Sequence, residues 1–173
     1  MRRLMLLRHS QAERAEPGES DRARVLTERG RTDAVKIGAY MARHAMVPGE
    51  VLISAAARAQ ETWKHAAAVF QPPPAMQSVE ELYNASPSAM LDVVKQAAAG
   101  SVLIVGHNPG VQEFALLVIA TGDIETRERL REGFPTSGLA IVDFAFDDWA
   151  SLHPHSGRLE RFVSPKWIEA ATN

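Results

Sequence analysis

The chain has 173 residues, of which 46% are hydrophobic and 23% charged, and its formal net charge is −2 at pH 7. These values are typical of a folded globular protein, exclude disordered and fibrous classes, and predict one domain over residues 1–173. Because acidic and basic residues alternate along the chain, we expect no basic face for nucleic acid and no membrane-binding surface.

Cysteine is absent, which excludes disulfide bonds, thiol nucleophiles and cysteine-based metal sites. The first residues, MRRLMLLRHS, imitate a signal peptide, but Arg8 interrupts their apolar run, whereas a signal sequence needs ~7 to 15 apolar residues in a row. The longest later apolar run, Phe114–Ala120, is far shorter than the ~20 residues that span a bilayer. We therefore expect a cytoplasmic protein. A monomer is compatible with these features, which leave the oligomeric state open.

The first half of the chain predicts two strands and two helices in alternation. Residues 3–7 and 51–54 are apolar stretches typical of buried strands. Residues 27–45, between them, repeat apolar side chains at three-to-four spacing, which predicts an amphipathic helix. Residues 56–70 repeat that pattern, and the prolines at 72–74 end this second helix because proline cannot donate a backbone hydrogen bond.

The middle of the chain continues the alternation. Ser86-Pro87 is a capping residue followed by proline, which predicts the start of a third helix. The stretch SVLIVG, residues 101–106, predicts another buried strand. Asn108-Pro109 repeats the capping signal and predicts a helix over PGVQEFALLVIA.

The C-terminal part of the chain has a different pattern. The charged segment GDIETRERLREG predicts a surface excursion, helical or mobile. Residues 139–146 predict a fourth buried strand, and together with residues 158–163 they are expected to form an antiparallel edge pair. The order of elements predicts a three-layer α/β/α sandwich with a mostly parallel sheet and an antiparallel C-terminal edge.

Arginines and histidines gather where the predicted strands end. Ligands of an open parallel sheet bind outside the carboxyl ends of its strands. Arg8 and His9 follow the first strand, and Arg58 lies one turn into the helix after the second. His107 follows the SVLIVG strand, and Arg24, in the loop after the first strand, could reach the same edge.

This positive cluster has two explanations. Arginines at one edge repel one another unless a multivalent anion or several carboxylates lie between them. Nearby acidic residues could supply those carboxylates as a salt-bridge cluster: Glu13, Asp21, Glu61 and Glu81. A phosphoryl group suits the arginines better, because guanidinium groups bind its oxygens bidentately. With no cysteine present, and no obvious base next to Ser10 or Ser54, a neutral imidazole is the best nucleophile available.

Several segments, in this order and spacing, resemble the histidine phosphatase superfamily (branch 1, phosphoglycerate mutase-like), whose mark is an Arg-His pair after the first strand. The segments are LLRHSQAE, DRARVLTERGRTDA, LISAAARAQETW and VLIVGHNPGVQEF. Within the superfamily the chain resembles the SixA-like phosphohistidine phosphatases, to which ELYNASPSAML and GFPTSGLAIVDF are also similar. The resemblance implies a phosphoglycerate mutase-like fold and phosphatase activity that requires no metal and no cofactor.

The resemblance also implies functions for individual residues. His9 would be the nucleophile that forms a phosphohistidine intermediate. The residues that would surround the phosphoryl oxygens are Arg8, Arg24, Arg58 and His107. Arg24 is preferred to Arg22 because it directly precedes VLTERG, where the family has its arginine.

The general acid is less well defined by the resemblance. Larger members of the superfamily protonate the leaving group with a glutamate, and Glu81 lies in the comparable stretch, with Glu80 and Asp21 as alternatives. Cleavage of a P–N bond expels an imidazole. The departure of an imidazole depends less on a general acid than the departure of an alkoxide does. Ser10 replaces the family's glycine, and it would be strained if that position required φ > 0.

The substrate class follows from the length of one connection. Only KHAAAVFQPPPAMQSVE separates Thr62 from Glu81, so we expect no lid over the site. An open site favours a phosphohistidine on a signalling or phosphotransfer protein as substrate, with phosphate as product. The alternatives are a broad small-molecule phosphomonoesterase of the same superfamily and a phosphate-binding module without turnover.

Overall fold

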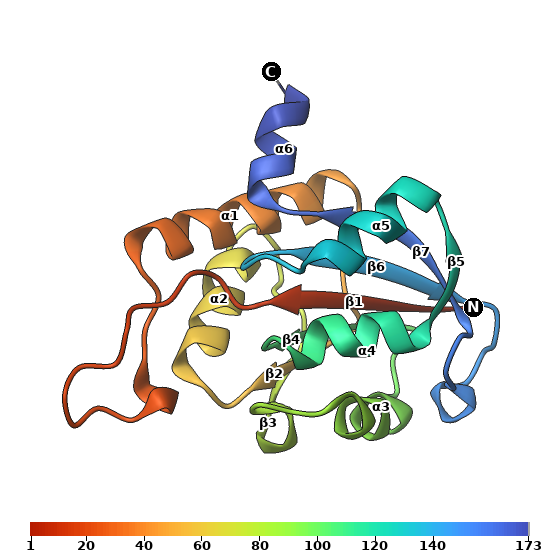
Figure 1. The fold of residues 1–173 in the computed structure, drawn as a ribbon, viewed down its shortest axis with the longest axis horizontal. Helices are drawn as coiled ribbons and strands as arrows, with labels where there is room; N and C mark the ends of the chain where they lie inside the picture. The colour runs from red at the N-terminus through yellow and green to blue at the C-terminus, as the bar shows by residue number, and fades with distance from the viewer. Residues whose placement is uncertain (173) are drawn as a thin grey trace.

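The computed structural model describes residues 1–172, which form a seven-stranded sheet flanked by helices (Figure 1). The strand order is β3-β2-β4-β1-β6-β7-β5. The strands are β1 (Arg2–Arg8), β2 (Glu50–Ser54), β3 (Met76–Val79), β4 (Ser101–Gly106), β5 (Ile119–Gly122), β6 (Leu139–Phe144) and β7 (Gly157–Val163). All neighbouring pairs are parallel except those that β6 makes with β1 and β7. The mostly parallel sheet that the element order predicts is therefore confirmed.

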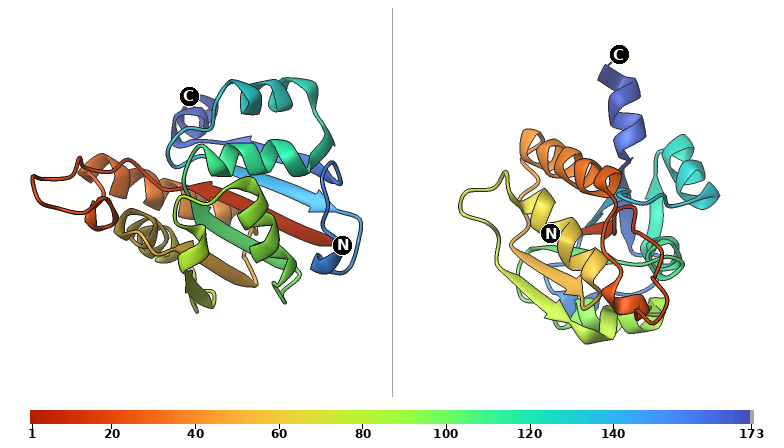
Figure 2. Two further views of the ribbon diagram at one scale, coloured as in Figure 1. Left: turned by 60° about the horizontal axis from the view of Figure 1, so that its bottom comes forward. Right: turned by 90° about the vertical axis from the view of Figure 1, so that its left-hand side faces the viewer.

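The described part of the chain has six α-helices, of which α1 to α5 cover the two faces of the sheet and α6 projects away from it (Figures 1 and 2). They are α1 (Glu28–Arg43), α2 (Ala57–Ala67), α3 (Pro87–Lys95), α4 (Gly110–Val118), α5 (Ile124–Glu132) and α6 (Pro165–Thr172). One core packs α1 and α2 against the sheet, and a second core packs α3, α4 and α5 against the other face. The predicted three-layer sandwich is confirmed.

Strand β4 shows why the middle of the sheet is apolar on both sides. Val102 and Ile104 lie in the core beneath α3 and α4, whereas Leu103 and Val105 lie in the core beneath α1 and α2. Successive side chains of a strand point to opposite faces, so a strand covered by helices on both faces needs an unbroken apolar run. Such a run is what SVLIVG provides.

The helix starts follow local capping chemistry. The Ser86 hydroxyl accepts a hydrogen bond from the Ala89 N–H at 3.1 Å, and Pro87 begins α3 as predicted. The helix predicted to start at Pro109 instead begins at Gly110 and ends at Val118.

The chain after α4 continues as strand β5, which pairs with β7. The prediction of a helix as far as Ala120 is therefore wrong for its last two residues. An apolar run does not reveal where a helix ends and a strand begins. The antiparallel pairing of β6 with β7 is confirmed, although β5 lies outside them at the sheet edge. Strand β3 and helix α6 had no sequence-based prediction.

The carboxyl ends of β1, β4 and β2 meet at one edge of the sheet. Arg8 pairs with Gly106, and Ile53 pairs with Val105. The segment between β1 and α1 extends outward at this edge (Figure 2). No helix of the described residues is long and apolar enough to cross a membrane.

Candidate active site

Two histidines lie next to each other at this edge. His9 directly follows β1 and His107 directly follows β4, so the strand register sets them at the same level. Their ring centroids are 5.2 Å apart. Both side chains are buried, with exposed fractions of 9% and 5%. The structure thus brings together two histidines that are 98 positions apart in the sequence (107 − 9).

His9 has one nitrogen fixed and the other available. Its Nδ1 lies 2.7 Å from the carbonyl oxygen of Ser10. A carbonyl only accepts hydrogen bonds, so the neutral ring carries its hydrogen on Nδ1 and its lone pair on Nε2. Burial lowers the pKa of His9 to about 3; the Ser10 hydrogen bond opposes this shift, and the charges of His107, Arg58 and Arg8 add to it. His9 is therefore a neutral imidazole at pH 7, as a nucleophile requires.

His107 presents the opposite nitrogen. Its Nε2 lies 2.7 Å from the Ser54 hydroxyl, which also accepts a hydrogen bond from the Ala56 N–H. We assign the Ser54 hydroxyl as the donor to Nε2, and in that tautomer His107 carries its hydrogen on Nδ1. That Nδ1 is buried without a hydrogen-bond partner. Buried polar atoms are nearly always paired, so an unpaired donor in a cluster of cations indicates an anion as its ligand.

Acidification is expected to destabilise the protein through these histidines. Burial, with Arg58 and other cations, lowers the pKa of His107 to about 4, below the 6.5 of an unfolded histidine, and the pKa of His9 lies lower still. Between pH 6.5 and 5 the unfolded chain takes up protons that the folded chain does not, so the free energy of unfolding falls by on the order of 2 kcal/mol per histidine.

Urea unfolding at pH 7 and at pH 5 measures this loss. The variant His107→Asn should lose less stability on acidification than the wild type, because it lacks a histidine whose pKa is lowered in the folded chain. An identical acid-induced loss in His107→Asn would contradict a depressed pKa at that position.

Two arginines lie beside the histidines, and each has an N–H group without a hydrogen-bond partner. Arg58 is only 4% exposed. Its Nη1 donates to the Asp21 carbonyl at 2.8 Å and its Nη2 to the Asp21 carboxylate at 3.1 Å, whereas its buried Nε has no partner. Arg8 donates from Nη1 to the carbonyl of Phe134 at 2.8 Å, and its Nε is also buried and unpaired. Guanidinium N–H groups held in this way are suited to bind anion oxygens.

Asp21 links the arginines that come from different segments. Its carboxylate accepts from Arg24 Nη1 at 3.0 Å, from Arg58 and from the Tyr83 hydroxyl. The Tyr83 hydrogen bond, followed by those of Arg24 and Arg58, holds the pKa of Asp21 well below its usual range. Arg24 therefore joins the cluster through Asp21, and part of the salt-bridge explanation applies: one carboxylate is paired with two of the arginines.

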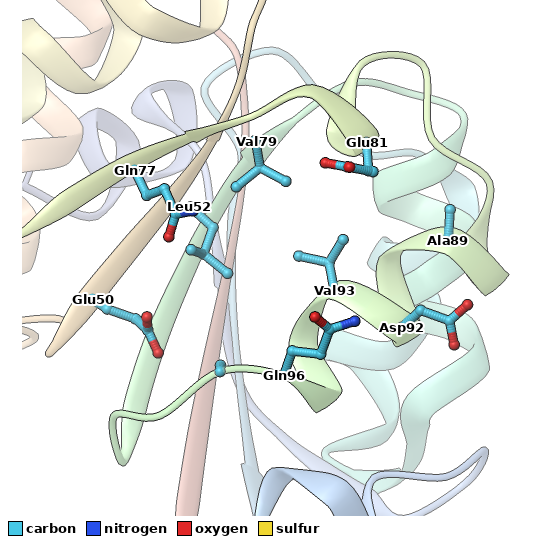
Figure 3. Close-up of a pocket in the computed structure, with 10 residues that line it drawn as sticks. Glu50, Leu52, Gln77, Val79, Glu81, Ala89, Asp92, Val93 and Gln96 are labelled. Carbon is cyan, nitrogen blue, oxygen red and sulfur yellow. The ribbon is translucent and has the colours of Figure 1, made fainter.

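Glu81, predicted as the general acid, lies elsewhere. Its side chain points into a cavity of about 500 Å³ between β2, β3 and α3, which also contains Asp92 (Figure 3). Neither histidine lines that cavity. Glu80 pairs with Arg22 at the surface. Of the three candidates for the general acid, Asp21 is the one that contacts the arginine and histidine cluster. A catalytic function for Glu81 stays an untested prediction.

Ser10 does not occupy a strained position. The φ angle of Ser10 is not positive, so the backbone strain that a glycine would relieve does not arise. Its N–H donates to the Thr62 hydroxyl at 2.9 Å, and its own hydroxyl lies 2.6 Å from that of Ser137.

Sequence reasoning missed Ser137 and Tyr83 as members of the site, although both lie in segments that carry the family resemblance. The described residues contain no cluster of His, Cys, Asp and Glu that could hold a metal ion.

Comparisons with known proteins test the resemblance directly. No family model matches the chain. An uncharacterized protein of Mycobacterium tuberculosis is 30% identical over 153 residues, which are 86% of this chain and 94% of that protein. The crystal structure of a candidate phosphohistidine phosphatase SixA from Agrobacterium tumefaciens matches with a TM-score of 0.81 and 33% identity, over 95% of this chain and 98% of that one. The chain belongs to the histidine phosphatase superfamily.

A further solved structure has the same fold. The protein histidine phosphatase SixA complexed with tungstate matches with a TM-score of 0.73 over 96% of this chain and 99% of that one. Its sequence identity is 21%, so it supports the fold alone. The 33% identity to the Agrobacterium tumefaciens structure supports a phosphatase activity of the histidine phosphatase family for this chain.

Proposed function

We propose that this SixA-like protein removes the phosphoryl group from a phosphohistidine of another protein, through a covalent intermediate on His9. The observation that carries the proposal is the hydrogen bond from His9 Nδ1 to the Ser10 carbonyl. It leaves Nε2 of a neutral, buried ring as a nucleophile beside the spare N–H groups of Arg8, Arg58 and His107.

In the first step, the Nε2 lone pair of His9 forms a bond to phosphorus. The bond from phosphorus to the substrate imidazole breaks, and its electron pair leaves with that ring. In the second step a water molecule attacks the phosphorus, the bond to Nε2 breaks, its electrons return to His9, and phosphate is released with a proton. The cationic N–H groups stabilise the charge on the equatorial oxygens in both steps.

The state of Asp21 favours a P–N bond over a phosphate ester. An ester expels an alkoxide, which needs a proton from a neutral acid, whereas Asp21 has a lowered pKa and is ionised. A substrate imidazole that carries a proton on its other ring nitrogen leaves as a neutral ring and needs no such acid. A phosphohistidine thus suits the ionised carboxylate beside Arg58.

The experiment that tests the substrate class compares phosphate release from a phosphohistidine-bearing phosphotransfer protein with release from a panel of sugar phosphates. We expect kcat/KM for the phosphoprotein to be at least about tenfold higher, a difference of about 1.4 kcal/mol in activation free energy. Faster turnover of a sugar phosphate would favour the small-molecule phosphomonoesterase. Anion binding without turnover of any substrate would favour a binding module.

A further inference from the structure

The turn between α5 and β6, residues 134–138, closes over the end of β1. The Arg8 N–H donates to the Gly138 carbonyl at 3.0 Å. In return, the Ser137 N–H donates to the carbonyls of Arg8 and His9, at 3.1 and 3.2 Å. The Phe134 carbonyl accepts from the Arg8 side chain. The turn therefore holds both the backbone and the guanidinium of the Arg-His pair.

Ser137 adopts a backbone conformation that serine rarely takes. Its φ is +61°, in the left-handed region, and its side chain is fully buried. Residues other than glycine reach this region at a cost, and such strain persists only where surrounding contacts impose it. Here the contacts are the two backbone hydrogen bonds to the Arg-His pair and the hydroxyl contact with Ser10.

Ser10 connects this turn to the nucleophile. The two serine hydroxyls are 2.6 Å apart although 127 positions separate them in the chain. The Ser10 N–H is held by the Thr62 hydroxyl, which in turn donates to the carbonyl of Arg58 at 2.7 Å. With its N–H and hydroxyl both held, the remaining polar group of Ser10, its carbonyl, points in a fixed direction toward His9 Nδ1.

We propose that the Ser10–Ser137 hydroxyl pair positions the nucleophile. The pair fixes the Ser10 carbonyl, the carbonyl keeps the hydrogen of His9 on Nδ1, and Nε2 is thereby left with its lone pair for attack. The effect of the Ser10–Ser137 pair on kcat rests on the function proposed above. The effect of the pair on the position of the His9 hydrogen does not. The family's glycine at position 10 could not make this contact, so the device depends on serine in this chain.

The test is the double variant Ser10→Ala/Ser137→Ala, which removes both hydroxyls and leaves neither one buried without a partner. Nitrogen-15 NMR of labelled histidine reports which ring nitrogen of His9 carries the hydrogen. We expect the Nδ1–H form in the wild type and a mixture of both forms in the double variant. With a phosphohistidine protein as substrate, kcat should fall by about tenfold while KM stays within about twofold, because a small misplacement of the nucleophile lowers reactivity without removing binding contacts.

Ser164→Ala is the matched control. Ser164 is also buried, and its hydroxyl accepts from the Trp167 N–H at the start of α6 instead of contacting Ser10 or Ser137. This variant should keep the wild-type NMR signals and kcat. Should the double variant fail to fold, Ser10→Ala carries the same two measurements.

Wild-type NMR signals and kcat in a folded double variant would overturn the positioning inference. A wild type that does not hydrolyse phosphohistidine would overturn the proposed function instead, and the NMR comparison would still decide the question about the serines.

Discussion

Replacement of His9 by alanine is expected to abolish turnover and leave the fold intact. Without the imidazole the site lacks the nucleophile of the proposed mechanism, and the two-step route through a phosphohistidine is closed. The fold should survive because His9 belongs to neither hydrophobic core, and the hydrogen bond of its side chain is to the adjacent Ser10 carbonyl. Phosphate release and thermal unfolding measured on the same preparation separate the two effects.

The control for this variant is His153→Ala. His153 is exposed and its ring also contacts a nearby carbonyl, that of Ser151. It should retain wild-type activity. Normal phosphate release by His9→Ala would end the covalent mechanism, and loss of activity in both variants would point to general damage.

Replacement of Arg58 by alanine is expected to slow the reaction by roughly 10²- to 10³-fold, or about 3 to 4 kcal/mol, by analogy with loss of one preorganised donor. The change removes the buried, unpaired Nε N–H that we assign to the phosphoryl oxygens. Asp21 would keep its hydrogen bonds to Arg24 and Tyr83, so its carboxylate would remain in place. Single-turnover rates with a phosphohistidine protein measure the loss.

Two further arginine variants make this result specific. Arg58→Lys keeps the charge but not the planar fork, so it should recover only part of the rate. Arg22→Ala changes an exposed arginine that pairs with Glu80 and covers the Tyr83 ring, and it should stay within about twofold of the wild type. An unchanged rate in Arg58→Ala would reduce Arg58 to an ion-pair partner of Asp21.

The strand ends and the residues that follow them could be predicted from the sequence. An apolar run such as SVLIVG has visible limits, and the geometry of a parallel sheet requires that its strands end at one edge. The positions of Arg8, His9, Arg58 and His107 therefore followed from the chain alone. Strand β5 could not be predicted because its residues continue the apolar pattern of α4.

Side-chain direction in loops could not be predicted either. Glu81 and Tyr83 are two positions apart, yet Tyr83 contacts Asp21 whereas Glu81 lines a separate cavity. Spacing in a short 3₁₀ turn does not decide which side chain turns toward the site. The contact between Ser10 and Ser137 depends on the folded turn 134–138, which no local pattern reveals. The single-domain organisation and the cytoplasmic location stay predictions.

The central claim is that the phosphoryl group passes through His9, and mapping of a trapped intermediate tests it most directly. The wild-type protein is mixed with a radiolabelled phosphohistidine protein, quenched within a turnover, digested and analysed by mass spectrometry under alkaline conditions. We predict an alkali-stable, acid-labile phosphoryl group on the peptide that contains His9. Turnover with no labelled enzyme, or with the label on a residue other than His9, would contradict the mechanism.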